Sequence, residues 1–481
     1  MRPRAKNRSR ESSRRLKAER QATAQNVDSK LPKKLFLETV GVDRSKLIHD
    51  AVKKVLWEVG AIYEHVPTQQ KLINDYGCRE IDGERIQIPP DLVDKALSTV
   101  PRQIKLYDLN GKERVDTSSD IPSFCPGHNC VQILDHRTDS LRPARLDDIR
   151  STARLCEALP NIDVVCSLGY PSEVAPEDEV TECTRAMYEN STKPAALLAH
   201  DEFIQERMMK IVADIAGGWN RITEKPVSIE LMGPVSPLKL PAELCIRLTN
   251  CARWRVPVVC YPATFPGMSS PISIAGAIVQ SSAEAIAGIL IHQLEEPGAP
   301  VMSGSAILPM DLRQANLAYG SPEYMLSGLG ASEYFNYAGI PAWVGAGCSD
   351  SHQFDAQAAA EAGANLAIAA LANASFVHNL GFLSGGRTGS LEMLTLCDEL
   401  IGWTSKMANG LDVNAETLAV EVIQRAAPDN EFLTDPHTQD RFLTESWYPK
   451  LSDRSDSEAW QKAGSQDMRA RIKQKIHDVL H

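Results

Sequence analysis

The sequence has few aromatic residues and no uninterrupted hydrophobic run that could cross a bilayer. Phe, Trp and Tyr make up 6% of the 481 residues, while apolar residues as a whole make up 43%. The longest apolar stretches are broken by Gly, Pro or charge, so we expect no membrane helix. The N-terminus also lacks the apolar core of a secretory signal, which favours the cytoplasm.

Cysteine pairs at the spacing of metal or redox motifs are also missing. The eleven cysteines include no C-x-x-C pair. Cys125 and Cys130 are the closest two, but no Cys/His pair follows them at the spacing of a zinc site. H-E-x-x-H, Walker and G-x-G-x-x-G patterns are absent as well, which argues against a metal cluster and a nucleotide-binding fold. We therefore expect eleven reduced thiols and no metal.

Charge is unevenly distributed along the chain. The net charge is −11, yet residues 1–20 carry nine Arg or Lys against two Glu. This basic segment is too polar to fold alone, so residues 1–34 are predicted to form a disordered, solvated tail. The acidic remainder argues against nucleic acid as the main ligand.

Strand and helix patterns alternate through residues 161–410, and this alternation indicates βα units around a parallel sheet. The size of the region favours a TIM-type (β/α)8 barrel within the α/β class. An α+β region over 35–160 precedes it, and a C-terminal helical tail over 411–481 follows. Seven barrel strands are predicted, namely 163–168, 195–199, 227–232, 257–261, 300–304, 342–346 and 375–379. The eighth is either the segment around Phe124 or one after Gly381.

The stretch with the most candidate reactive residues is Pro341–Gln357. An apolar strand runs into Gly345 and Gly347, polar residues follow to His352, and Asp355 then begins an Ala-rich helix. A strand that ends in a polar loop before a helix is how a (β/α) barrel builds its reactive end. The competing interpretation is a plain βα turn with a capping Asp.

The other strand ends exclude some reaction types. No Lys stands directly after a predicted strand, which disfavours a Schiff-base aldolase. No Ser occupies a G-x-S-x-G elbow, so Asp350 and His352 do not complete a nucleophilic triad. The same two residues could serve as an acid–base pair in a cofactor-independent lyase or isomerase.

Several longer blocks of residues carry a family resemblance. Phe265–Pro271, Gly347–His352, Asp355–Gln357 and Leu391–Glu399 together resemble the trimethylamine methyltransferase (MttB) superfamily. The resemblance implies a TIM-type barrel that passes a methyl group from an amine to the cobalt of a separate corrinoid protein.

The chain departs from the founding branch of that superfamily at one point. That branch carries pyrrolysine close to the position of Cys348, and this sequence has an ordinary Cys there. Members without pyrrolysine resemble demethylases of quaternary amines such as glycine betaine, proline betaine or carnitine. A quaternary nitrogen has no lone pair to add to an electrophilic ring, and it already carries a neutral tertiary amine as leaving group.

The expected site follows from the resemblance and from the strand ends. Catalytic roles are expected for Asp350, His352 and Cys348. Residues expected to bind the substrate, by aromatic faces, a carboxylate or hydrogen-bond donors, are Tyr261, Phe265, Arg313, Trp343, Phe354, Asp355, Gln357 and His378. Core packing is the competing interpretation for the aromatic residues, above all for Trp343.

The corrinoid itself is expected to arrive on a partner protein. The D-x-H-x-x-G signature of a corrinoid-binding chain begins at Asp350, but Asp355 stands where Gly is required. No tightly bound cofactor is therefore expected, and the cognate corrinoid protein is the expected partner. The Ala- and Gly-rich helices favour a homo-oligomer. A barrel that binds quaternary amines without reacting is the alternative from another functional class.

Overall fold

Seven parallel strands form the central sheet of the protein, which a computed structural model describes over residues 37–119 and 121–481. The expected tail over residues 1–34 lies outside these residues. The strands in spatial order are β6 (Ser123–Pro126), β19 (Phe376–Leu380), β18 (Ala342–Gly345), β14 (Val301–Gly304), β12 (Val258–Cys260), β10 (Ser228–Met232) and β9 (Ala195–Leu197).

The segment 163–168 closes the gap between the first and last strands of this sheet. The amide of Asp163 donates to Phe124 O at 2.8 Å, and the amide of Ala196 donates to Val165 O at 2.8 Å. A single parallel bridge joins Val165 to Ala195, so this eighth strand is short and irregular. The Phe124 segment is therefore the barrel strand that the sequence left open, and the α/β barrel is confirmed.

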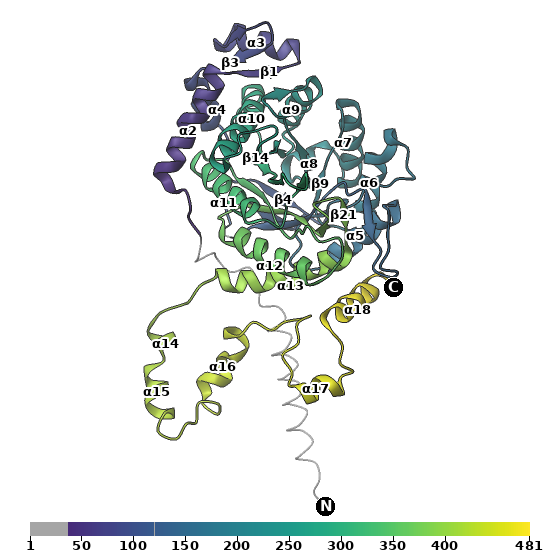
Figure 1. The fold of residues 1–481 in the computed structure, drawn as a ribbon, viewed down its shortest axis with the longest axis vertical. Coiled ribbons are helices and arrows are strands. Elements are labelled where there is room, and N and C mark those ends of the chain that lie inside the picture. Colours follow the sequence, from purple (N-terminus) through teal and green to yellow (C-terminus); the bar gives the residue numbers. More distant parts are fainter. Residues whose placement is uncertain (1–36, 120) are drawn as a thin grey trace, which may run out of the picture.

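Eight helices surround the strands as a ring (Figure 1). Each follows its own strand, as a (β/α)8 barrel requires. In chain order they are α5 (Leu146–Ala158), α6 (Pro176–Asn190), α7 (Glu202–Ala216), α9 (Ala242–Trp254), α10 (Ile274–Glu295), α11 (Pro322–Tyr337), α12 (Ala356–Leu371) and α13 (Leu391–Ala408). Four of them start at an N-cap whose side chain accepts a backbone N–H, namely Asp201 for α7, Ser321 for α11, Asp355 for α12 and Ser390 for α13.

Helix α10 is the one helix in the described part of the chain with the length and composition to cross a membrane. However, 72% of its most apolar 18-residue window is buried inside the protein. Gly288 lies against Leu248 of α9 and Cys260 of β12. The apolar character of α10 is therefore that of a helix packed on all sides in the barrel layer.

Alternate residues of each strand point into the barrel. Val259, Met302, Trp343 and Phe376 belong to the interior cluster, whereas their strand neighbours pack outward against the helices. The same interior cluster contains Leu106 of the hairpin β4 (Lys105–Tyr107) and β5 (Glu113–Asp116). This hairpin closes the amino-terminal end of the barrel, so the carboxyl-terminal end is where a ligand can enter.

An α+β layer packs on one side of the ring. It comprises α2 (Gly41–Glu58), α3 (Val66–Tyr76), α4 (Pro90–Ser98) and a small sheet of β1 (Ala61–Tyr63), β2 (Arg79–Ile81), β3 (Arg85–Gln87) and β11 (Lys239–Leu240). Glu333 of α11 accepts backbone N–H groups of Thr39, Val40 and Gly41, which fixes the start of α2 on the barrel.

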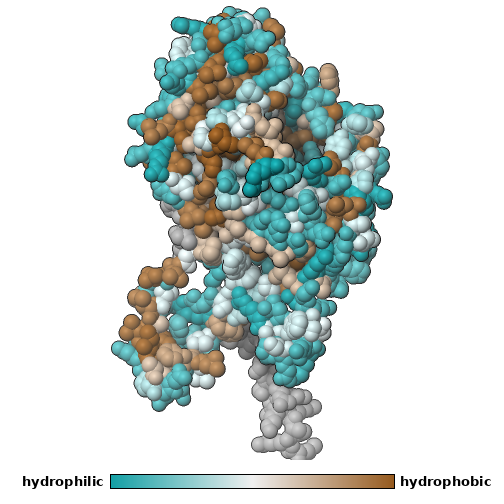
Figure 2. Space-filling view, viewed as in Figure 1, coloured by the Kyte–Doolittle hydropathy of each residue, from teal (hydrophilic) through white to brown (hydrophobic). Residues whose placement is uncertain are grey.

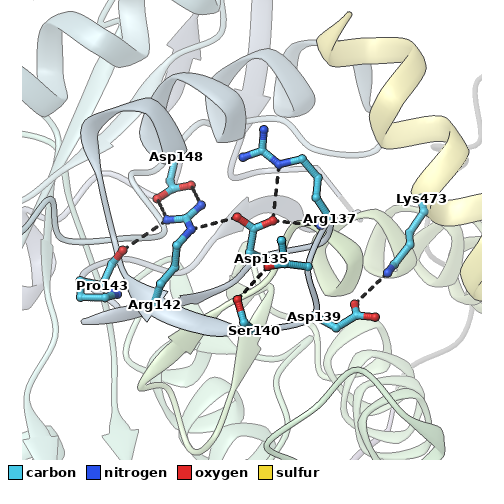
Figure 3. Close-up of polar contacts among 9 residues, drawn as sticks. Asp135, Arg137, Asp139, Ser140, Arg142, Pro143, Asp148 and Lys473 are labelled. Atoms are coloured by element: carbon cyan, nitrogen blue, oxygen red, sulfur yellow. Dashed lines mark hydrogen bonds and ion pairs between the residues drawn. The ribbon is translucent and has the colours of Figure 1, made fainter.

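A charged hairpin joins the barrel to the C-terminal helix (Figure 3). Its strands are β7 (Gln132–Leu134) and β8 (Leu141–Pro143). Arg142 forms two hydrogen bonds of 2.7 Å to Asp148 and another of 2.9 Å to Asp135. The Arg142 contacts and the backbone N–H of Arg137 lower the pKa of Asp135 to about 2, although burial opposes this. Lys473 of α18 (Met468–Leu480) reaches Asp139 at the hairpin turn.

A long excursion separates α13 from α18. It carries α14 (Ala415–Leu418), α15 (Val420–Ala426), α16 (Pro436–Glu445) and α17 (Ser457–Lys462), and it projects beyond the ring of helices (Figure 1). The chain returns at Leu451, which is buried in the main core together with Ile472 and Ile476 of α18. Hydrophobic side chains gather on the projecting part (Figure 2).

Candidate active site

Glycines make room at the carboxyl-terminal end of the barrel. A Cβ on Gly304 would overlap the carbonyl oxygen of Trp343 and lie 2.8 Å from the Tyr261 ring. A Cβ on Gly345 would overlap the Tyr324 hydroxyl. These positions point inward, so the missing side chains are replaced by aromatic rings from neighbouring segments.

The rings meet around His378 of β19. Its imidazole centroid lies 5.0 Å from that of Tyr261, 5.2 Å from Trp343 and 6.4 Å from His128. Trp343 in turn stacks on Phe376 at 4.0 Å and 10°. The sequence-based expectation named Tyr261, Trp343 and His378, and the structure brings these three together.

Two further tyrosines extend the cluster. Tyr319 and Tyr324 lie with their centroids 5.0 Å apart, and Asn379 of β19 donates to the Tyr324 hydroxyl at 3.1 Å. Burial is the main cause that raises the pKa of Tyr261, Tyr319 and Tyr324, so all three phenols stay protonated near neutral pH. We call the set Tyr261, Tyr319, Tyr324, Trp343 and His378 the aromatic cluster.

Two histidines near the aromatic cluster, His378 and His128, are neutral. Burial lowers the pKa of His378 to about 3 and that of His128 to about 4. The Nδ1 atom of His378 lies 2.9 Å from Val344 O, so Nδ1 carries the proton and Nε2 carries a lone pair. In the part of the chain that the structure describes, no Lys or Arg makes a cation–π contact with the aromatic cluster.

Two polar atoms beside the cluster are buried without a hydrogen-bond partner among the described residues. They are Trp343 Nε1 and His128 Nδ1. A buried N–H donor without an acceptor is costly, typically about 1–3 kcal/mol. Trp343 Nε1 can only donate, so a ligand or a water that offers an acceptor would remove this cost.

Asp350 holds the segment that carries Tyr319. Its carboxylate accepts the backbone N–H of Tyr319 at 2.8 Å and that of Gly320 at 2.9 Å. Burial raises its pKa, and these two N–H groups oppose the shift. Asp350 therefore positions an aromatic ring through the backbone, and its two oxygens are already engaged.

Three other expected residues lie on the loop and helix after β18. The exposed His352 places Nδ1 2.9 Å from Ser384 Oγ. Asp355 accepts from Ser351 Oγ and from the amide of Ala358, so it caps α12. Gln357 donates to Glu361 on the surface of that helix. The structure does not bring these three side chains to the aromatic cluster.

Cys348 is fully buried behind Gly347. Its Sγ is 3.7 Å from Asn365 Nδ2, and burial raises the pKa of the thiol well above its usual range. A protonated thiol is a poor nucleophile, so this environment does not favour covalent catalysis. Within residues 37–119 and 121–481, no group of three His, Cys, Asp or Glu could hold a metal ion.

The remaining three candidates lie apart from the cluster. Arg313 is 87% exposed and paired with Asp311 in the turn between β16 (Met310–Asp311) and β17 (Asn316–Leu317). Phe354 packs on the main core beneath the guanidinium of Arg469. Phe265 is partly buried against the same core. Among the described residues no ring pair or hydrogen bond joins these side chains to the aromatic cluster, although Tyr324 belongs to the same core as Phe354.

Sequence reasoning missed Tyr319, Tyr324 and His128. His128 follows β6, and assigning the Phe124 segment as a barrel strand would have placed it at the reactive end. The tyrosines flank the Ser321-Pro322 start of α11, a signal that was present in the sequence.

Comparison with known proteins shows the family of the chain. A family model described as trimethylamine methyltransferase (MTTB) matches residues 4–481. Trimethylamine methyltransferase MttB of Desulfitobacterium hafniense is 28% identical over 90% of this chain and 87% of its own. Glycine betaine methyltransferase of the same species is 28% identical over 87% and 88%. Trimethylamine methyltransferase MttB1 of Methanosarcina mazei is 30% identical over 91% and 89%.

A solved structure supports the fold independently. Monomethylamine methyltransferase (MtmB) of Methanosarcina barkeri is similar with a TM-score of 0.51, covering 94% of this chain and 90% of that one at 11% identity. Since the family model covers almost the whole sequence, the chain belongs to the trimethylamine methyltransferase (MTTB) family and is a methyltransferase that acts on methylated amines.

Proposed function

We propose that this enzyme moves a methyl group from a quaternary amine, glycine betaine or a related betaine, to the Co(I) corrinoid of a separate corrinoid protein. The observation that carries the proposal is the aromatic cluster, a set of neutral rings at the open end of the barrel. The family membership supports the methyl transfer, and the cluster supports the permanent positive charge of the substrate.

Aromatic faces attract a quaternary ammonium group through their quadrupoles, by about 0.5–2 kcal/mol for each well-placed ring. A protonated imidazole in the same place would repel the cation. His378 is held neutral, with its Nε2 lone pair unprotonated, so it adds attraction rather than repulsion. The cluster thus combines cation affinity with little accessible water.

The transfer itself requires no acid or base from the protein. The electron pair of Co(I) attacks the methyl carbon, a Co–C bond forms, and the C–N bond breaks. The C–N electrons remain on nitrogen, which leaves as a neutral tertiary amine. The positive charge of the substrate is neutralised in this step, and a dry aromatic site favours that loss of charge. The role of the protein is to hold one methyl group in line with the acceptor.

The unpaired Trp343 Nε1 supports a betaine in particular. A betaine carries a carboxylate close to its ammonium group, and that carboxylate would supply the acceptor that Trp343 lacks. Arg313 is exposed and already paired with Asp311, so it gives no support for the carboxylate contact. The relatives include a glycine betaine methyltransferase as well as trimethylamine methyltransferases.

The methyl acceptor is a substrate that the partner protein presents at the open end of the barrel. All eleven cysteines are free in the structure, in keeping with a reducing cytoplasm. Cob(I)alamin, which can stand in for the protein-bound acceptor, also requires reducing conditions.

The test mixes the enzyme anaerobically with Co(I) cobalamin and a panel of amines and follows the cobalt spectrum. Methylcobalamin should appear with glycine betaine, proline betaine or carnitine. Methyl transfer from trimethylamine but from no quaternary amine would overturn the substrate assignment. Saturable betaine binding without any methyl transfer would favour a binding protein.

The lyase or isomerase alternative receives no support from the site. Asp350 is bonded to backbone N–H groups and His352 to Ser384, so the two do not form a hydrogen-bonded acid–base pair. Turnover of a hydroxy or keto acid without corrinoid would nevertheless establish it.

A further inference from the structure

Residues 411–445, which we call the arm, leave the barrel after α13 and expose many apolar side chains. Leu411 is 87% and Leu433 is 84% exposed. Other large hydrophobic residues of the arm that are exposed are Val413, Leu418, Val420, Ile423, Phe432 and Phe442. Only Ala426 and Asp435 are buried within the arm, so it has no core of its own.

Short helices without a core are not stable alone in water. In the described part of the chain, the one hydrogen bond that joins the arm to α13 is that from Lys406 Nζ to Thr444 O, at 3.1 Å, at the root of the arm. Contiguous exposed apolar surface of this kind marks an interface. The arm must therefore be covered by another surface.

We propose that the arm of each chain packs against the barrel of a second copy of the same chain. The inference is independent of the proposed substrate. The arm projects outward past α13, away from the ring of helices (Figure 1). A corrinoid protein at the open end of the barrel would leave it uncovered. A partner that must leave in every reaction cycle is also a poor match for a surface this apolar, since permanent interfaces are the more hydrophobic ones.

Charge argues for arm-to-barrel contact rather than arm-to-arm contact. Residues 411–445 contain eight Asp or Glu and two Arg. Two arms side by side would therefore repel each other. On the barrel, Trp403 and Met407 of α13 are exposed directly beside the root of the arm. A twofold axis near this face lets each arm cover the α13 face of the other chain, which makes the contact reciprocal.

The test measures the mass of the full-length protein by sedimentation. We expect a multiple of 52.8 kDa for the wild type. The double variant Leu411→Glu/Leu433→Glu should sediment as a single chain, because it places charge on the covered surface. Both side chains are more than four-fifths exposed within one chain, so the thermal transition and circular dichroism of the barrel should not change.

Two further variants sharpen the result. Phe203→Glu is the matched control, because Phe203 is 72% exposed on α7, outside the arm, and this variant should keep the assembly intact. Trp403→Glu should dissociate the assembly, as the double variant Leu411→Glu/Leu433→Glu does. A monomeric wild type, or an assembly that survives the arm substitutions, would overturn the proposal. Dissociation by the arm variant but not by Trp403→Glu would overturn the reciprocal contact with α13.

Discussion

Tyr261 offers the sharpest residue-level test of the aromatic cluster, because no side-chain hydrogen bond fixes its hydroxyl in the described part of the chain. Tyr261→Leu removes a ring that lies 5.0 Å from His378. We expect the dissociation constant for glycine betaine to rise roughly 5- to 30-fold, corresponding to about 1–2 kcal/mol. Calorimetric titration without cobalamin measures this directly.

Tyr261→Phe is the matched control, since it keeps the ring and should bind within about twofold of wild type. Equal binding by the Leu variant and the wild type would place the cation elsewhere.

The buried histidines predict a loss of stability in acid. The folded pKa of His378 is about 3 and that of His128 about 4, below the ordinary value near 6.5. Between these values the unfolded chain binds protons that the folded chain does not, so stability is present above pH 6.5 and falls as the pH drops. At pH 5 the loss is roughly 2 kcal/mol for each histidine.

Denaturant titrations at pH 7 and pH 5 should show this loss of unfolding free energy. In His378→Asn the loss should be smaller by the contribution of one histidine. A variant whose stability falls as steeply as that of the wild type would contradict the neutral state of His378. The interval from pH 8 to pH 7 is the internal control, because the folded histidines stay neutral there and the unfolded ones take up only a small fraction of a proton.

The site was only partly predictable at this scale. Tyr261, Trp343 and His378 are within or directly after strands, so the strand pattern identified them. Tyr319 and Tyr324 follow the β16–β17 hairpin, after which the chain runs back to the aromatic cluster. No periodic pattern in the sequence indicates this change of direction. A catalytic role was expected for Asp350, but its two carboxylate oxygens accept the backbone N–H groups of Tyr319 and Gly320.

At the level of elements, the close approach of β14 and β18 depends on Gly304. Its backbone pairs with Trp343, and a side chain there would overlap the Trp343 carbonyl and press on Tyr261. Because the obstacle is backbone, Gly304→Ala should destabilise the protein by about 1–3 kcal/mol. It should also weaken betaine binding by displacing Tyr261.

Thermal unfolding measures the change in stability, and calorimetric titration with glycine betaine measures the change in binding. Gly363→Ala is the control, since nothing lies within 4 Å of a Cβ at that helical position. A Gly304→Ala protein with unchanged melting temperature would show that the strands can separate without cost.

The strand–helix alternation was readable because buried parallel strands and the helices between them differ in period and length. Six of the seven predicted strands lie in the sheet. The predicted strand 163–168 closes the barrel through a single bridge and irregular hydrogen bonds, and the Phe124 segment supplies the barrel strand that the pattern did not assign. Its strand, β6, is four residues long and is followed by a hairpin, so the local sequence favoured antiparallel pairing over a barrel strand.

At the level of the whole molecule, the arm is an insertion between two parts of one core. Trp447 lies beside Gly402 of α13, and Glu399 accepts the backbone N–H groups of Lys450, Leu451 and Ser452. Helix α18 then packs on the barrel through Arg469 and Glu392. The two ends of the arm are therefore held close together by contacts that do not involve the arm itself.

Replacing residues 411–445 with a short Gly/Ser linker should consequently leave the barrel folded. We expect a monomer that melts at the same temperature as the double variant Leu411→Glu/Leu433→Glu, since loops between fixed ends tolerate changes in length at small cost. Its affinity for glycine betaine should lie within about twofold of that of the double variant. Sedimentation, thermal unfolding and calorimetric titration measure the three properties. An unfolded product would show that the arm stabilises its own barrel, whereas a folded product that still assembles would place the interface between copies on the barrel alone.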